Sequence, residues 1–231
     1  MSSVAPFAPG TGFRAVVVMP ENIAQGPRAI YPVSGGRTAA WPAPGRRAYR
    51  GAVIYSIGHS TRPLAELLAL LRAHGVTHVV DVRRYPASRR HPQFARDALA
   101  AALAAAGIGY RHEPDLGGRR AARPDSPNTA WRNPGFRGYA DHMASAAFGA
   151  ALERLIEVAR ERPTAILCAE AVPWRCHRRL IADALVARGE AVEHILGAGA
   201  VQRHVLSPHA VPGPGGALRY PGGPGGQLAL C

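Results

Sequence analysis

Short apolar runs alternate with amphipathic segments over residues 51–206. Runs typical of strands occupy 52–57, 77–82, 108–113, 164–169 and 191–196, and patterns typical of helices occupy 63–75, 94–107, 136–162 and 176–189. The segment 136–162 suits one long helix or two. Strands that alternate with helices of this length predict right-handed crossovers and parallel pairing. We therefore expect a three-layer, Rossmann-like α/β fold, with a mainly parallel sheet of about five strands and helices on both faces.

Both ends of the chain lack this pattern. Residues 1–50 are rich in Pro, Gly, Ser and Ala, and residues 207–231 are rich in Gly and Pro. Neither segment has enough periodic apolar sequence to offset the entropy of ordering it. We therefore predict a flexible N-terminal extension at 1–50, one α/β domain at 51–206 and a low-complexity tail at 207–231, which carries Cys231.

The charge is strongly positive and comes from arginine alone. The formal net charge is +13, with 28 arginines and no lysine in 231 residues. The abundance of Ala, Gly, Pro and Arg is also typical of a GC-rich genome, so much of the excess needs no functional cause. The absence of lysine excludes Schiff-base chemistry on lysine and a phosphate-loop lysine. Arginine binds phosphate in a bidentate manner, so a phosphate-bearing small molecule or a nucleic acid is a candidate partner.

The chain has no sequence feature that suggests export or membrane insertion. It contains no run of about 18 apolar residues, and its first residues are a poor signal peptide because Pro20 interrupts the apolar stretch. With only three cysteines, we expect a cytoplasmic protein without a membrane partner or a structural disulfide.

Residues suited to chemistry follow the predicted strands. In open parallel sheets, ligands bind beyond the carboxyl ends of the strands, which lie at one edge. The residues near these ends are Gly58, His59 and Ser60, then Asp81, Arg83 and Ser88, then Tyr110, Gly117 and Gly118, and finally Cys168, Glu170, Cys176, His177 and Arg178. Their coincidence at one sheet edge is the main functional signal of the sequence.

These motifs also carry a family resemblance. The stretches "YSIGHSTRPLAELLALL", "VVDVRRYPASRR", "LGG", "FRGYADHM" and "CAEAVPWRCHRRLIADAL" follow one another in this order. Over roughly residues 52–196 the chain resembles the domain of unknown function 488 family. The resemblance implies a small cytoplasmic α/β domain, and it implies neither a reaction nor a cofactor.

Two motifs favour binding of an anion. Five arginines between Arg83 and Arg96 lie at and beyond a strand end, and Arg83 is nearest to that end. The alternative is a solvated arginine surface. Gly58 allows close approach of a ligand to the backbone, and His59 then offers an acid or base at a helix start. The alternative for His59 is a residue that packs in the turn.

The two cysteines near residue 170 allow several interpretations. Cys168 and Cys176 are eight positions apart, which is not the spacing of a redox pair, and with His177 they match no standard zinc pattern. We therefore assign no metal ligands. Cys168 suits a buried strand, whereas Cys176 stands at a helix start beside His177 and Arg178, where a thiolate is stabilised. Glu170 is the leading acid or base, with an ion pair to Arg83 or Arg178 as the alternative.

The sequence thus predicts a small enzyme with a phosphate- or oxyanion-binding site, acting on a nucleotide or nucleic-acid-related substrate. We expect Glu170, His59 and Cys176 to perform the chemistry, with Glu170 more important than either thiol. The alternatives are a non-catalytic nucleic-acid-binding module and a metal- or thiol-based redox protein. We expect the substrate to be bound by Gly58, Ser60, Asp81, Arg83, Ser88, Tyr110, Gly117, Gly118, His177 and Arg178.

Overall fold

The structure is a computed structural model that describes residues 53–87, 90–213 and 217–223. All of these belong to one compact unit, Arg47–Cys231. The predicted extension at 1–50, together with Ser88, Arg89 and Cys231, lies outside the described residues.

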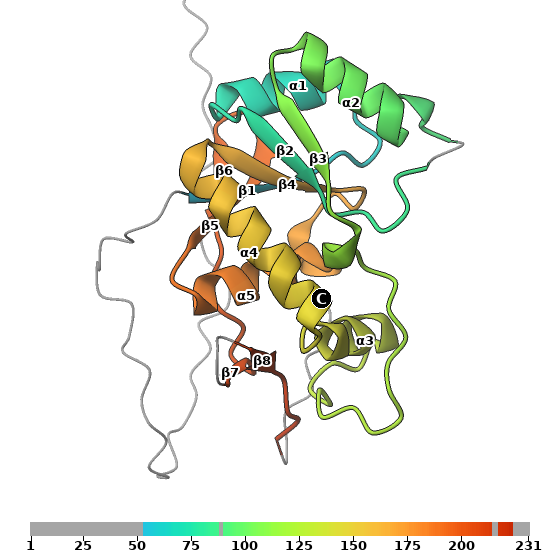
Figure 1. Ribbon diagram of the computed structural model, residues 1–231, viewed down its shortest axis with the longest axis vertical. Coiled ribbons are helices and arrows are strands. Elements are labelled where there is room, and N and C mark those ends of the chain that lie inside the picture. The colour runs from blue at the N-terminus through green and yellow to red at the C-terminus, as the bar shows by residue number, and fades with distance from the viewer. Residues whose placement is uncertain (1–52, 88–89, 214–216, 224–231) are drawn as a thin grey trace, which may run out of the picture. The chain divides into compact units, whose positions relative to one another are not determined.

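The described part of the chain is a mixed α/β structure around a six-stranded, mostly parallel sheet (Figure 1). The strand order is β3-β2-β4-β1-β5-β6, and only the pairing of β5 with β6 is antiparallel. About five strands were predicted, and the additional one is β6, an exposed edge strand without an apolar run. The strands are β1 Val53–Gly58, β2 His78–Asp81, β3 Gly109–His112, β4 Thr164–Cys168, β5 Ala191–Gly197 and β6 Ala200–Arg203.

Neighbouring residues along the strands pack into two different apolar clusters. Val79 joins a cluster with the leucines of α1 and α2, whereas Val80 joins a cluster with the apolar residues of α3, α4 and α5. This alternation follows from the two-residue period of a strand. Figure 1 shows α1 and α2 together at the top and α4 and α5 below them. The helices are α1 Leu64–Ala73, α2 Arg96–Ala105, α3 Pro134–His142, α4 Ala146–Glu161 and α5 Arg178–Ala187.

The long helical segment forms two helices. Asn133 caps α3 through its side-chain oxygen, which accepts hydrogen bonds from the backbone N–H groups of Gly135 and Phe136. Ser145 caps α4 in the same way and accepts from Phe148 N–H. Serine competes with the helical backbone for hydrogen bonds, so it starts a new helix here rather than continuing the first.

The predicted low-complexity tail contributes to the core. Two short strands, β7 Val211–Pro212 and β8 Leu218–Arg219, pair with each other. Leu218 and the neighbouring Tyr220 are buried. The Tyr220 hydroxyl donates a hydrogen bond to the buried Asp183 in α5 at 2.9 Å. Two apolar residues among glycines and prolines give no periodic pattern, so composition alone does not indicate this contact.

None of the helices in the described ranges is long and apolar enough to cross a membrane.

Candidate functional site

The carboxyl ends of three neighbouring strands meet at the centre of the sheet. Gly58 at the end of β1 is in register with Cys168 at the end of β4, and Asp81 at the end of β2 is in register with Leu167. The pairing continues past the strand ends, because His59 N–H donates to Cys168 O at 3.0 Å and Val82 N–H donates to Leu167 O at 3.0 Å. The motifs that follow these strands are therefore spatial neighbours, as the sequence predicts.

Two thiols and one imidazole form a compact group at this edge. Cys168 Sγ, Cys176 Sγ and a ring nitrogen of His177 all lie within 4.8 Å of one another. His177 Nδ1 is 3.7 Å from Cys176 Sγ and 3.9 Å from Cys168 Sγ. His177 Nε2 donates to the carbonyl oxygen of Val82 at 2.9 Å. Because a carbonyl only accepts, Nε2 carries a proton, and Nδ1 is the ring nitrogen that faces the sulfur atoms.

Arg178 supports this group from within the protein. Its side chain is only 1% exposed, and its Nε donates to Cys176 Sγ at 3.4 Å. The other donors reach Ser56 Oγ at 3.0 Å and the carbonyl oxygens of Glu170 at 2.6 Å and Ala171 at 3.3 Å. None of these partners is a carboxylate, so the positive charge is buried beside sulfur and neutral oxygen.

The environment separates the pKa values of the two thiols. Burial raises the pKa of Cys176, but the hydrogen bond with Cys168 and the neighbouring His177 and Arg178 outweigh burial and place it well below its usual value. The hydrogen bond with Cys176, together with burial, raises the pKa of Cys168 well above the usual value.

Arg83 lies in a different environment. It is 7% exposed, and its Nε donates to Asp81 Oδ1 at 2.8 Å while Nη1 donates to Phe94 O at 2.8 Å. Asp81 is fully buried and also accepts from the hydroxyl of Tyr110 at 2.8 Å. Burial, followed by the charge of Asp81, raises the pKa of Tyr110. These three predicted site residues thus form one buried, charge-balanced network.

His59 is held as a neutral ring. Its Nδ1 donates to Ser60 O at 2.9 Å, and its Nε2 accepts from Arg83 Nη1 at 3.3 Å. The ring is 3% exposed and stacks on Phe94 with the centroids 4.1 Å apart. Burial, together with the charge of Arg83, lowers the pKa of His59 to about 4. Both ring nitrogens therefore have protein partners.

The turn after β1 is tightly fitted to the turn after β4. A Cβ at Gly58 would lie 1.8 Å from the carbonyl oxygen of Glu170, so only glycine fits there. Ser60 has a φ of 47°, which residues other than glycine seldom adopt. Glu170 is exposed, and its carboxylate accepts from the N–H of Ala171 at 3.2 Å. Its main-chain oxygen holds Arg178, whereas its carboxylate does not contact the thiol group.

A glycine pair joins the thiol group to two arginines. A Cβ at Gly118 would lie 2.9 Å from His177 Nδ1, and a Cβ at Gly117 would lie 2.7 Å from Arg84 Cα. Arg120 Nε donates to Gly117 O at 3.0 Å, and Arg84 Nη1 donates to the carbonyl oxygen of Arg119 at 2.9 Å. Burial, followed by the charge of Arg84, lowers the pKa of Arg120. The two arginines thus approach the same glycine pair, and the Arg84 guanidinium also lies 5.4 Å from the centre of the Tyr85 ring.

A second histidine network lies close to the thiol group. His194 Nε2 and His204 Nδ1 are 3.0 Å apart, and His204 Nε2 donates to Asp183 Oδ1 at 2.8 Å. His194 pairs with Ser56 across β5 and β1, and its Nδ1 is buried without a partner. Sequence reasoning missed this network, Ser56 and Arg120. The residues of the network, Ser56 and Arg120 are each isolated polar positions outside any motif, so the sequence alone gives no signal for them.

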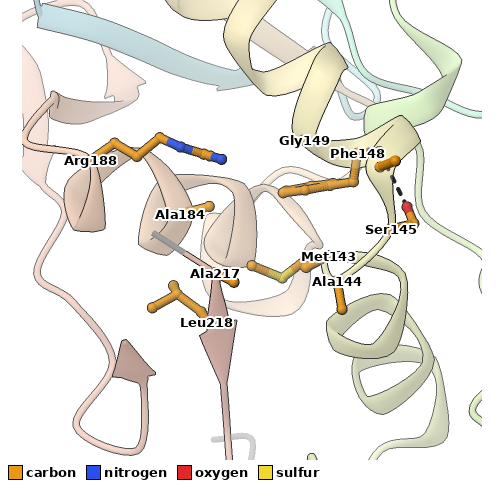
Figure 2. Close-up of a pocket in the computed structure, with 10 residues that line it drawn as sticks. Met143, Ala144, Ser145, Phe148, Gly149, Ala184, Arg188, Ala217 and Leu218 are labelled. Atoms are coloured by element: carbon orange, nitrogen blue, oxygen red, sulfur yellow. Dashed lines mark hydrogen bonds between the residues drawn. The ribbon is translucent and has the colours of Figure 1, made fainter. Parts of the chain in front are cut away.

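The structure has a cavity that is separate from these motifs. A cavity of about 310 Å³ opens between the junction of α3 with α4, the helix α5 and residues 217–218 (Figure 2). Its wall is mostly apolar, and its one charged residue, Arg188, pairs with Glu153 at 3.3 Å. No predicted site residue lines this cavity.

Comparisons with known proteins give one result. The model of a family described as Domain of unknown function DUF488 matches residues 63–185, which include most of the site. No curated protein and no solved structure matches the chain.

Proposed function

Since the chain belongs to the DUF488 family, whose description names no reaction, we propose from its own residues that it is a small enzyme. It acts on a phosphate-bearing substrate, such as a nucleotide or a nucleic-acid end, at the carboxyl edge of the sheet. The reaction takes place at the group formed by Cys168, Cys176 and His177.

The observation that carries the proposal is the pair of arginines next to this group. Among the described residues, no carboxylate lies within ion-pair distance of Arg84 or Arg120, and their side chains donate to the main-chain carbonyl oxygens of Arg119, Gly117 and Pro114. Two guanidinium groups that repel each other are stabilised by a shared anion, and phosphate fits their donors. The pair flanks Gly117 and Gly118, and a Cβ at Gly118 would touch His177. A phosphate held there would place its substituent near the thiols.

The other site residues take supporting roles in this proposal. The hydrogen bonds among Asp81, Arg83 and Tyr110 fix the segment that follows β2. This segment carries the carbonyl oxygen of Val82, which orients His177, and it also carries Arg84. His59 supports this segment through Arg83, whose Nη1 donates to His59 Nε2 at 3.3 Å. Glu170 remains a proposed acid or base that acts from the solvent side. Gly58, Ser60 and Arg178 shape the turn, and Ser88 lies outside the described residues.

The wider setting of this proposal is the one that the sequence predicts. The two apolar clusters support a three-layer, Rossmann-like arrangement. We further propose one domain at 51–206 and a location in the cytoplasm. The predicted extension at 1–50 lies outside the described residues, and Leu218 and Tyr220 of the predicted tail pack into the core.

Calorimetric titration with inorganic phosphate and pyrophosphate tests the anion site. We expect Arg84→Ala and Arg120→Ala each to weaken binding by roughly 10- to 100-fold, because a hydrogen bond to a charged group contributes about 1.5–3 kcal/mol. Arg72→Ala removes the same charge from the exposed part of α1 and is the matched control. Equal weakening by all three substitutions would show that only net charge matters and would sink the proposal.

A second assay separates the enzyme from the nucleic-acid-binding module. Short single- and double-stranded DNA is titrated at several salt concentrations. A module that covers many phosphates loses affinity steeply with salt, with a slope that grows with the number of contacts. We expect the slope of log affinity against log salt concentration to correspond to about one or two phosphate contacts, because the proposed site holds one phosphate group. A slope that corresponds to about six or more phosphate contacts would favour the binding module instead.

A further inference from the structure

We infer that Cys168, Cys176 and His177 bind one transition-metal ion of the zinc class and leave a fourth coordination position open. Sequence spacing gave no reason for a metal site, because eight positions separate the cysteines. The fold does give a reason, because the end of β4 and the start of α5 converge at the same edge of the sheet. The role of the ion in catalysis rests on the proposed function, but its binding does not.

The distances between the ligand atoms fit a tetrahedral ion. Zinc lies about 2.3 Å from sulfur and about 2.0–2.1 Å from nitrogen, which at a tetrahedral angle separates sulfur from nitrogen by about 3.6 Å. The observed separations are 3.7 Å from Cys176 Sγ and 3.9 Å from Cys168 Sγ to His177 Nδ1. The sulfur-to-nitrogen separations therefore need only a small contraction around an ion, and the two sulfurs lie within 4.8 Å of each other.

The surroundings of the ligands also fit a metal site. A metal-binding histidine donates its second ring N–H to a carbonyl or carboxylate, and His177 Nε2 donates to Val82 O at 2.9 Å. Arg178 donates to Cys176 Sγ and is itself fixed by three further acceptors, so it supports a metal-bound thiolate. Gly118 has no side chain where a Cβ would meet Nδ1, which keeps that side of the ring clear.

The ligand set indicates the kind of ion and its role. Two sulfurs and one imidazole suit zinc better than magnesium or calcium, which prefer oxygen. Within residues 53–87, 90–213 and 217–223, no fourth Cys, His, Asp or Glu joins the group. Three protein ligands with an open position are typical of catalytic rather than structural zinc. As a divalent ion binds, any proton still held by Cys168 or Cys176 is released to the buffer.

Cobalt titration of the full-length, chelator-treated protein tests this inference. Cobalt reports its own ligands, because thiolate coordination gives a near-ultraviolet charge-transfer band and tetrahedral geometry gives intense visible bands. We expect one equivalent of Co²⁺ to bind with both signals and one equivalent of Zn²⁺ to displace it. Cys168→Ser and Cys176→Ser should each weaken Co²⁺ binding by more than the roughly 10–100-fold that loss of a supporting residue costs.

Cys231→Ser is the matched control, since it removes the third cysteine of the chain and should leave the spectrum unchanged. Circular dichroism verifies that each variant is folded. His177→Gln provides a second test without altering a thiol, and it should remove the tetrahedral spectrum while both thiols remain titratable.

Several results would overturn the inference. Two freely titratable thiols without bound cobalt would leave a thiol nucleophile, and a disulfide between Cys168 and Cys176 would indicate a redox pair. Cobalt retained by both serine variants would place the ion elsewhere. Phosphate binding without cobalt binding would refute only the metal site, whereas cobalt binding without phosphate binding would refute only the proposed function.

Discussion

Two buried arginines at the same sheet edge differ in what balances their charge. Arg83 is 7% exposed and forms an ion pair with Asp81, which is itself fully buried. Arg178 is 1% exposed, and its partners are a sulfur atom, a hydroxyl and two carbonyl oxygens. The first environment is neutral as a unit. The second is neutral only when a nearby sulfur carries a negative charge or a bound group supplies one.

This difference determines which of the two arginines could act on a bound group. A buried ion pair whose hydrogen bonds are complete holds its segment in place but offers nothing to a ligand. A buried cation without a carboxylate instead stabilises an anionic form of what it touches, here Cys176. Arg83 stands nearest to a strand end, which makes it the arginine that the sequence favours for an anion, whereas the fold commits its donors to Asp81 and Phe94.

The largest effect should come from breaking the balanced pair. Arg83→Ala leaves the Asp81 carboxylate buried without its partner, and we expect a loss of about 3–5 kcal/mol in the free energy of unfolding. Urea denaturation measures this loss. Arg84→Ala removes the neighbouring, half-buried arginine and should change stability by less than about 0.5 kcal/mol. A loss below about 1 kcal/mol for Arg83→Ala would show that water reaches Asp81 and would weaken the comparison.

An intermediate effect should appear in acid, from a histidine near Arg178. Burial, followed by the charges of His204 and Arg178, lowers the pKa of His194 to about 3 from the ordinary 6.5, while Cys176 and Asp183 act in the opposite direction. Between about pH 6.5 and pH 3, His194 is therefore protonated in the unfolded chain but neutral in the folded protein. Stability is complete above about pH 6.5 and is lost as the pH falls towards 3, by about 2 kcal/mol between pH 7 and 5 for this one group.

Urea denaturation at several pH values checks this expectation against His194→Gln, which cannot gain the proton. The variant should lose about 2 kcal/mol less than the native chain over the same pH interval. Parallel pH profiles for the two proteins would mean that His194 titrates normally and that Arg178 does not act on it as an unbalanced charge.

The smallest effect should come from the carboxylate of Glu170. It is exposed and lies outside the partners of Arg178, so Glu170→Gln should change stability by less than about 0.5 kcal/mol. It should also leave cobalt and phosphate affinity within about twofold. A large fall in turnover with these properties intact would identify Glu170 as the acid or base that the sequence ranks first. A marked loss of stability would instead show that Glu170 balances Arg178.

The sequence predicts the order of the central elements well because each has a strong period or a clear stop. The predicted helix at 63–75 is observed as Leu64–Ala73, and the predicted strand at 164–169 as Thr164–Cys168. The edge strand Ala200–Arg203 has no such pattern, because all four of its residues are exposed. Its pairing with β5 depends on main-chain hydrogen bonds, for which the side chains give no signal.

The candidate site is predictable in place but less so in its contacts. Parallel strands put their carboxyl ends at one edge, so the neighbourhood of Gly58, Asp81 and Cys168 follows from strand order alone. Which arginine faces a carboxylate depends instead on side-chain packing. Arg83 and Arg84 are adjacent in sequence, and only the structure shows that one is paired with Asp81 while the other bonds to a main-chain oxygen.

The position of β4 has a consequence for how the protein is made. This strand inserts between β1 and β2, although more than 80 residues separate it from β2 along the chain. The sheet therefore cannot close until residues 164–168 have left the ribosome, and contacts of such long sequence separation form slowly. Between their exit from the ribosome and that pairing, Cys168 and Cys176 are exposed to solvent. The proposed metal site can therefore assemble only after β4 has paired with β1 and β2.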